Sequence, residues 1–343
     1  MNGYERMVAA LELREPDQIP MMEFGFHPTV IKSLAPEAKD VFDLVEQMGL
    51  DGINVGGGHS PSPSTTSEPI HTDRWGIKWA LTAESYTPIE GPIKSEADLA
   101  TYVPPDPYDD FWIEGVRKAV ERFKGKVLID FHTRSDYMSA CDVRGMTELL
   151  IDFIDNPKLA HGVLSMISDW YCALIGRAIE AGADAISLGD DWAGSTAPMM
   201  SPDQFREFVL PYFQRAVTLC KDAGVYVIKH CDGNIWPILD MVIDTGIDAI
   251  NPIQPDAGMD IGEVKRKYGD RVCLAGNVDC GYVLSNAPTE EVVQVVKDTI
   301  RKAGPGGGYI MMSSNSIHSS VKPENYRAMF DTTREFGRYP LRV

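Results

Sequence analysis

The chain has 343 residues, of which 44% are hydrophobic and 24% charged, as expected for a globular enzyme with a substantial core. Its formal net charge of −18 argues against nucleic acid and anionic membranes as partners, because both attract clustered Lys and Arg. No apolar run reaches the length of about 18 residues that a membrane span needs, and the charged N-terminal segment lacks a secretory pattern. We therefore expect a cytoplasmic protein, and its six cysteines, which include no CxxC pair, are expected to be reduced thiols.

Short β-rich runs recur along the chain and alternate with longer segments of helical spacing. Such alternation predicts right-handed βαβ units and a parallel sheet, and eight strands in this length favour a closed (β/α)₈ barrel, the TIM-barrel fold. We expect one α/β domain over residues 1–343. The predicted strands cover residues 19–25, 51–57, 126–132, 184–190, 225–230, 248–253, 271–277 and 308–314.

Residues 58–110 interrupt this alternation, because they are rich in Pro, Ser and Gly and contain a hairpin-like run around Trp75, Gly76 and Trp79. This segment is predicted to be an insertion after the second strand that lies over one mouth of the barrel. Its tryptophans could line a substrate pocket or pack in the core.

Three of the intervening helices carry clear end signals. The segment 201–224 has Ser201 as a cap before Pro202 and ends at Gly224, while Pro211 predicts a kink or break inside it. Residues 156–182 and 289–304 likewise begin at a capping residue and end at glycine.

The active site of such a barrel lies at the carboxyl ends of its strands, so the polar residues that follow each apolar run are the candidates. We predict catalytic roles for Asp190, Asp191 and His132, although the two aspartates could instead cap a helix or bind polar groups of a substrate. The predicted substrate-binding residues are Glu23, His27, Asn251, Asn277 and Trp192.

The run VYVIKHCDGN, residues 225–234, ends a buried strand in an imidazole, a thiol and a carboxylate. Residues 230 and 232 are two apart and would share the face toward the barrel axis, while Cys231 points elsewhere. With His318 after the last strand, His230 and Asp232 form a predicted site for a divalent ion such as zinc, with Cys231 as an alternative ligand. The competing interpretation is that the histidines are hydrogen-bonded structural residues and Cys231 a buried thiol.

Five motifs in order, GDDWAGSTAPMMSPDQFREFVLPYFQRAV, HCDGN, GIDAINPIQ, AGNVD and SSNSIHSSVKPENYRAM, resemble the uroporphyrinogen decarboxylase superfamily, a group of (β/α)₈ barrels. The likeness covers most of the chain from about residue 180 onward. True decarboxylases of this superfamily bind an acidic tetrapyrrole through arginines after the first strand and need no metal. Here that stretch reads IPMMEFGFHPTVIKSL and contains no arginine, and the acidic chain would repel an octacarboxylate.

The other branch of the superfamily contains corrinoid-dependent methyltransferases with a zinc site built from His-x-Cys after strand five and Cys after strand eight. By this resemblance His230 keeps the histidine place and Asp232 falls at the cysteine place, while after the eighth strand Asn315 and His318 are the nearest ligands. A His and carboxylate set suits oxygen chemistry better than activation of a thiol.

The resemblance thus implies a methyltransferase that takes a methyl group from a methoxylated aromatic, or another methyl ether or amine, to the Co(I) corrinoid of a partner protein. Zinc or a general acid, Asp190, Asp191 or protonated His132, would stabilise the leaving phenolate. The alternatives are a decarboxylase-like lyase and a methylcobamide:thiol methyltransferase. A homodimer is the default expectation for the assembly.

Overall fold

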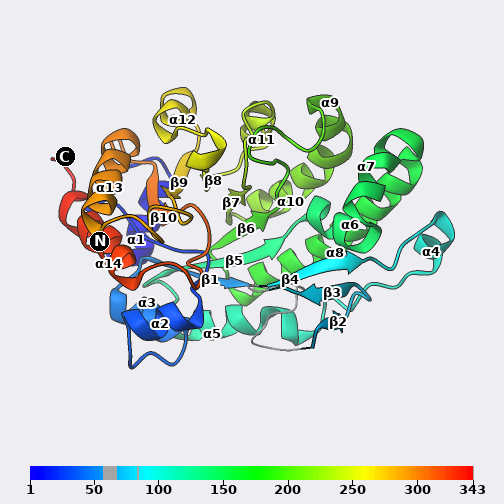
Figure 1. Ribbon diagram of the computed structural model, residues 1–343, viewed down its shortest axis with the longest axis horizontal. Helices are drawn as coiled ribbons and strands as arrows, with labels where there is room; N and C mark the ends of the chain where they lie inside the picture. Colours follow the sequence, from blue (N-terminus) through cyan, green and yellow to red (C-terminus); the bar gives the residue numbers. More distant parts are fainter. Residues whose placement is uncertain (57–67, 83–84, 343) are drawn as a thin grey trace.

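The computed structural model describes residues 1–56, 68–82 and 85–342. Its centre is a curled sheet of seven parallel strands, so the predicted α/β class is confirmed (Figure 1). Neighbouring strands in the sheet follow one another in the order of the chain, as right-handed βαβ units require. They are β1 (Gly52–Gly56), β5 (Leu128–Arg134), β6 (Ala185–Gly189), β7 (Tyr226–His230), β8 (Ala249–Asn251), β9 (Cys273–Val278) and β10 (Tyr309–Ser313).

The first predicted strand, residues 19–25, does not form a regular strand. Its carbonyls reach both edges of the sheet instead, because Pro20 O accepts from the Met311 N–H at 2.9 Å and Met21 O accepts from the Asp51 N–H at 2.8 Å. Proline has no N–H to donate, so an uninterrupted ladder cannot run through this segment. The segment therefore contacts β10 through one isolated bridge, Met21 to Met311, and reaches the residue before β1 through the Asp51 N–H. The fold is TIM-barrel-like, with seven regular strands among the described residues.

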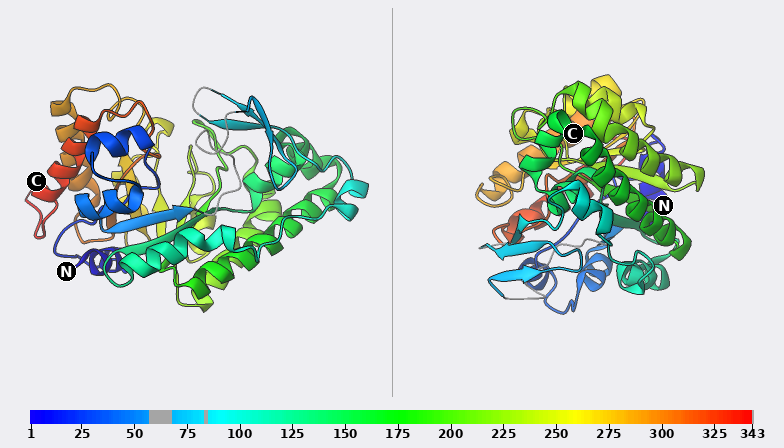
Figure 2. Two further views of the ribbon diagram at one scale, coloured as in Figure 1. Left: turned by 90° about the horizontal axis from the view of Figure 1, so that it is seen from below. Right: turned by 90° about the vertical axis from the view of Figure 1, so that its right-hand side faces the viewer.

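Helices pack on the outer side of the curled sheet (Figure 2). The predicted helix 201–224 is irregular but continuous: a π-helical turn, η2 (Phe205–Val209), lies between α9 (Pro202–Gln204) and α10 just before Pro211, where a kink or break was predicted. No helix in the described ranges combines the length and the apolarity needed to cross a membrane. The remaining helices are α1 (Gly3–Leu11), α2 (Pro28–Leu34), α3 (Val41–Met48), α4 (Glu96–Thr101), η1 (Asp110–Ile113), α5 (Glu114–Phe123), α6 (Asp136–Arg144), α7 (Met146–Asp155), α8 (Pro157–Ala181), α10 (Leu210–Asp222), α11 (Leu239–Asp244), η3 (Pro255–Ala257), α12 (Ile261–Tyr268), α13 (Thr289–Ala303) and α14 (Pro323–Phe336).

The inside of the sheet is filled by a separate apolar cluster at the amino ends of the strands. Helix α1 contributes Met7, Ala10 and Leu11 to it, and these side chains pack against Leu128 of β5, Ile228 of β7 and other inward-facing residues. Burial of such side chains stabilises each by about 1.5–3 kcal/mol. The amino end of the barrel is therefore closed, and polar inward-facing residues occur toward the carboxyl ends.

Between β1 and β5 the chain forms a small antiparallel sheet of β2 (Ile70–Thr72), β3 (Lys78–Leu81) and β4 (Tyr86–Glu90), which lies far from α1 (Figures 1 and 2). Trp75 and Trp79 are both 1% exposed, and the Trp75 ring lies 4.6 Å from that of Trp170, so these tryptophans pack in the core. Parts of the predicted insertion, residues 58–67 and 83–84, lie outside the described residues. Its position over the barrel mouth stays a prediction.

Candidate metal centre

Three side chains that follow β6 and β7 converge at the carboxyl ends of the strands. One ligand atom from each of Asp191, His230 and Asp232 lies within 4.8 Å of the others. Nε2 of His230 is 3.7 Å from Oδ1 of Asp232 and 3.9 Å from Oδ1 of Asp191. Ligand atoms around a tetrahedral Zn²⁺ lie about 3.4 Å apart, as follows from metal–ligand distances of about 2.0–2.2 Å. The cluster is therefore close to the dimensions of a metal site.

The local sequence brings the two loops together through glycine. Gly233 has φ +88°, and a Cβ there would lie 2.5 Å from Ala193 O and 2.6 Å from Gly194 O. Only a residue without a side chain allows the β7 loop to approach the β6 loop this closely. The Asp232 N–H then donates to Oδ1 of Asp191 at 2.9 Å, which joins the two acidic residues directly.

The orientation of His230 is fixed by β8. Nδ2 of Asn251 donates to Ala275 O at 3.1 Å, so Oδ1 of the same amide is the acceptor that faces Nδ1 of His230 at 2.6 Å. When the imidazole is neutral, its proton is thereby held on Nδ1, and Nε2 keeps its lone pair toward the two carboxylates. This is the arrangement that metal-binding histidines adopt with an outer hydrogen-bond acceptor.

Asp232 supplies the observation that best tests the fit of a cation. Nδ2 of Asn315 donates to its Oδ2 at 2.7 Å, while its Oδ1 is buried with no hydrogen-bond partner in the described part of the chain. Burial raises the pKa of this carboxyl group, and the charge that His230 carries when it is protonated opposes the rise. A buried carboxylate oxygen without a donor is compensated when a cation binds it. The donor set, two carboxylates and one imidazole, suits zinc and harder divalent ions.

His132 stands behind this cluster on β5. Its ring lies 6.3 Å from that of His230 and 5.0 Å from that of Phe24, and Gly189 leaves the space that the ring occupies, since a Cβ there would lie 2.6 Å from Cε1 of His132. Burial, and then the charge of His230, lower the pKa of His132 to about 3. The imidazole is therefore neutral near pH 7, and its surroundings do not support the predicted role of a protonated general acid.

Asp190 lies beside the cluster but faces away from it. Its Oδ2 and Oδ1 accept from the N–H groups of Tyr137 and Met138, each at 3.0 Å, so it caps the N-terminus of α6. The sequence left a capping role open for this residue, and the helix that it caps, α6, lies earlier in the chain, before α7 and α8. Of the paired aspartates, Asp191 is the one that reaches His230.

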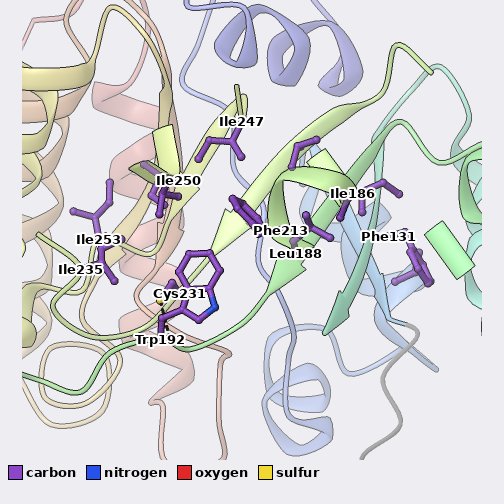
Figure 3. Packing of buried hydrophobic residues seen from close by; sticks show 14 of the residues in the cluster. Phe131, Ile186, Leu188, Trp192, Phe213, Cys231, Ile235, Ile247, Ile250 and Ile253 are labelled. Atoms are coloured by element: carbon purple, nitrogen blue, oxygen red, sulfur yellow. Dashed lines mark hydrogen bonds between the residues drawn. The ribbon is translucent and has the colours of Figure 1, made fainter. Parts of the chain in front are cut away.

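Two predicted metal ligands are not brought to the cluster. Sγ of Cys231 accepts from the Trp192 N–H and donates to Asp232 O, both at 3.3 Å, and lies in the apolar core (Figure 3). Burial raises the pKa of this thiol to about 12. Nδ1 of His318 accepts from the Ser320 N–H at 3.3 Å, outside the cluster. Asp191 therefore takes the place that the sequence analysis gave to His318.

The predicted substrate-binding residues have mixed positions. Asn251 orients His230, whereas Trp192 is 0% exposed and packs against Phe205 and Phe213. His27 caps α2 by accepting from the Thr29 N–H at 3.3 Å.

The other two, Glu23 and Asn277, are buried. Glu23 accepts from the Ser313 N–H at 3.1 Å, and burial raises its pKa to about 8. Asn277 donates to Ile253 O at 2.9 Å and lines a cavity of about 490 Å³ beside Asp256 and Asp279. Asn315, named with His318 as a nearest candidate ligand after the last strand, contacts the cluster by donating to Asp232. Lys229, whose Nζ donates to Asp190 O, was not predicted as a site residue; a lysine inside an apolar strand was the available signal.

Known proteins agree with this architecture. Uroporphyrinogen decarboxylases are similar in sequence: that of Thioalkalivibrio sulfidiphilus is 28% identical over 273 residues, 73% of this chain and 72% of that protein. The corresponding protein of Alkalilimnicola ehrlichii is 30% identical over 267 residues, 73% of this chain and 69% of that protein. A solved structure of a methyltransferase from Methanosarcina mazei has the same fold, with a TM-score of 0.78, 19% identity and coverage of 98% of this chain and 99% of that one.

The family model of uroporphyrinogen decarboxylase (URO-D) matches residues 71–336, which include β3 to β10, Asp191, His230 and Asp232. The sequence motifs, the curled parallel sheet and this match over most of the chain agree, and the protein belongs to the uroporphyrinogen decarboxylase (URO-D) family of enzymes.

Proposed function

We propose that this protein is a metal-dependent methyltransferase that moves a methyl group from a methoxylated aromatic, or a related methyl ether or amine, to the Co(I) corrinoid of a partner protein. The observation that carries the proposal is the Asp191, His230 and Asp232 cluster with its unpartnered Oδ1. The methyltransferase with the same fold and the absence of arginine from residues 19–34 support the same conclusion.

The reaction breaks the methyl C–O bond, gives the electron pair of Co(I) to the methyl carbon and leaves a phenolate that is protonated to a phenol. A divalent ion at the cluster supplies Lewis-acid stabilisation of the leaving oxygen. Asn251 and Asn315 hold His230 and Asp232 in place for that ion. The ring centre of Phe24 lies 4.8 Å from that of His230, and these rings with the buried, neutral imidazole of His132 would limit the access of water to the inner wall of the site.

A thiol as methyl acceptor is less well supported. Its activation uses a thiolate-rich zinc site, and the nearest thiol, that of Cys231, faces the core with a raised pKa. The competing activity is decarboxylation of an acidic substrate, which the names of the sequence relatives favour.

The test uses the full-length protein, loaded with Zn²⁺ or treated exhaustively with a chelator, and free cob(I)alamin as the methyl acceptor. A panel of methoxybenzenes that includes guaiacol and vanillate supplies the methyl group. We expect methylcobalamin, followed by its absorption spectrum, and the matching phenol, both only with the metal-loaded protein. Decarboxylation of uroporphyrinogen that survives chelation, together with no methyl transfer across the panel, would replace this proposal with the lyase.

A further inference from the structure

Lys229 is a charged side chain in an apolar layer. It is the penultimate residue of β7, is 0% exposed and alternates with His230, so it points away from the barrel axis. Its Nζ lies 3.8 Å from the centre of the Trp192 ring and 5.7 Å from that of Phe213 on α10. An ammonium group is rarely buried to this extent unless partners compensate its charge.

Three backbone carbonyls supply that compensation. Nζ donates to Asp190 O at 2.8 Å, to Leu188 O at 3.2 Å and to His230 O. An ammonium group has three N–H donors, so the number of acceptors matches the number of donors. Two of these carbonyls belong to the end of β6 and one to the end of β7.

The positions of these carbonyls connect Lys229 to the metal centre. Asp190 O is in the residue directly before Asp191, and His230 is itself part of the cluster, two residues before Asp232. A single ammonium therefore joins the backbones of the two loops that carry all three candidate ligands. On the other side of the loops, the bond from the Asp232 N–H to Asp191 completes the link.

We propose that Lys229 is a positioning residue for the metal centre, whose ammonium fixes the ends of β6 and β7 so that Asp191 and Asp232 face Nε2 of His230. This inference rests on the metal site of the proposed function. Lys229 touches neither the metal nor the substrate, because it lies on the opposite face of the strand. Its effect on the ligands is transmitted through the three carbonyls.

The test compares Lys229→Met with Lys265→Met. Lys265, on α12, is partly buried and, like Lys229, donates to a backbone carbonyl, Gly307 O at 2.6 Å, but that carbonyl precedes β10 at the opposite end of the barrel. Each full-length variant is titrated with Co²⁺, whose visible absorption reports coordination geometry, and is also unfolded thermally. We expect about 10- to 100-fold weaker Co²⁺ binding and an altered spectrum for Lys229→Met, a range typical of residues that orient metal ligands. Lys265→Met should bind Co²⁺ within about two-fold of the parent and keep its spectrum, because it supports neither ligand loop.

Lys229→Gln is the second variant, for the case that Lys229→Met does not fold. Its side-chain amide keeps N–H donors, although the side chain is shorter than that of lysine. We expect an affinity between those of the parent and Lys229→Met. Parent-like Co²⁺ affinity and spectrum in a folded Lys229 variant would overturn the inference while leaving the metal centre intact. If the parent itself binds no Co²⁺, the metal centre of the proposed function fails, and the positioning role fails with it.

Discussion

The two ends of the barrel contain different kinds of side chain. At the amino end, Met7, Ala10 and Leu11 of α1 fill the interior with apolar side chains. At the carboxyl end, Asp191, His230 and Asp232 meet, and one carboxylate oxygen lacks a donor among the described residues. The amino end buries apolar side chains, which stabilises the fold, whereas the carboxyl end keeps a buried carboxylate oxygen without a donor, which costs stability. Substitutions at the amino end should therefore change mainly stability, and substitutions at the cluster should change mainly metal affinity.

The largest expected effect is the loss of metal binding in Asp232→Asn. The amide keeps the shape of the side chain but removes an anionic ligand, so we expect Co²⁺ affinity to fall by about 100-fold or more, beyond the loss typical of residues that only orient ligands. The same change removes a buried carboxylate whose ionisation is disfavoured by burial, so the metal-free variant should unfold at a temperature at least as high as the parent. Titration with Co²⁺ and calorimetry measure the two effects, with Asp203→Asn on the exposed α9 as the control.

At the closed end, Met7→Ala should change stability alone. Met7 is 0% exposed in the cluster at the amino ends, and a large-to-small change there costs about 2–5 kcal/mol of unfolding free energy. Denaturant unfolding measures the cost, and Met146→Ala, at a residue 37% exposed, is the matched control. A weakened Co²⁺ affinity in folded Met7→Ala would show that the two ends are not independent.

Glu23→Gln tests how the stability of the folded protein depends on pH through one buried carboxyl group. The pKa of Glu23 is raised to about 8 in the folded protein, so the folded state binds a proton more tightly than the unfolded state. Its contribution to stability is present below pH about 4.5 and is lost as the pH rises through about 8. Gln cannot ionise, so the variant should lose less stability than the parent between pH 5 and pH 9, by a few kcal/mol at about 1.4 kcal/mol per pKa unit. Denaturant unfolding at the two pH values measures the loss of unfolding free energy. An equal loss in Glu23→Gln and in the parent would contradict this prediction.

Gly233→Ala should loosen the contact between the two ligand loops. An added Cβ would lie 2.5 Å from Ala193 O, at a residue whose φ is +88°. We expect a loss of about 1–3 kcal/mol and about 10-fold weaker Co²⁺ binding, because strain of this size is relieved by moving the loop. Gly224→Ala is the matched control: its φ is +71°, but its Cβ would have nothing within 4 Å, so it should show the backbone cost without the loss of affinity.

The smallest effect is expected for His318→Ala. The residue makes a local bond to the Ser320 N–H and lies outside the cluster, so Co²⁺ affinity should stay within about two-fold of the parent. A large loss of affinity would restore His318 as a ligand and would require the last loop to close over the site. Isothermal titration of the metal-free protein distinguishes the two results.

The parts of the fold that depend on local pattern could be predicted from the sequence. Seven apolar runs became strands at nearly the expected positions, and the two-residue spacing correctly set the facing of His230 and Asp232. The first apolar run, residues 19–25, does not form a regular strand, because Pro20 has no N–H to donate to a neighbouring strand. A prediction based on the apolar pattern alone does not take this into account.

The choice among neighbouring polar residues could not be made from sequence. Asp190 and Asp191 are chemically identical and adjacent, and only the position of α6 decides that the first is a cap and the second faces His230. His318 follows the right strand but its loop directs it elsewhere. Lys229 was overlooked because its role depends on three carbonyls from two strand ends, and such an arrangement has no counterpart in spacing along the chain.

The apolar cluster of α1 at the amino ends of the strands has a kinetic consequence. With the amino end of the barrel filled by this cluster, we expect the site to be approached, among the described residues, from the carboxyl ends of the strands. On the proposed function, the small methyl donor and the much larger corrinoid protein then share one entrance. The donor must bind first and the corrinoid protein second, and the demethylated product can leave only after the partner has departed. Steady-state rates would show an ordered sequential mechanism in which excess corrinoid protein inhibits by trapping the emptied or product-bound enzyme.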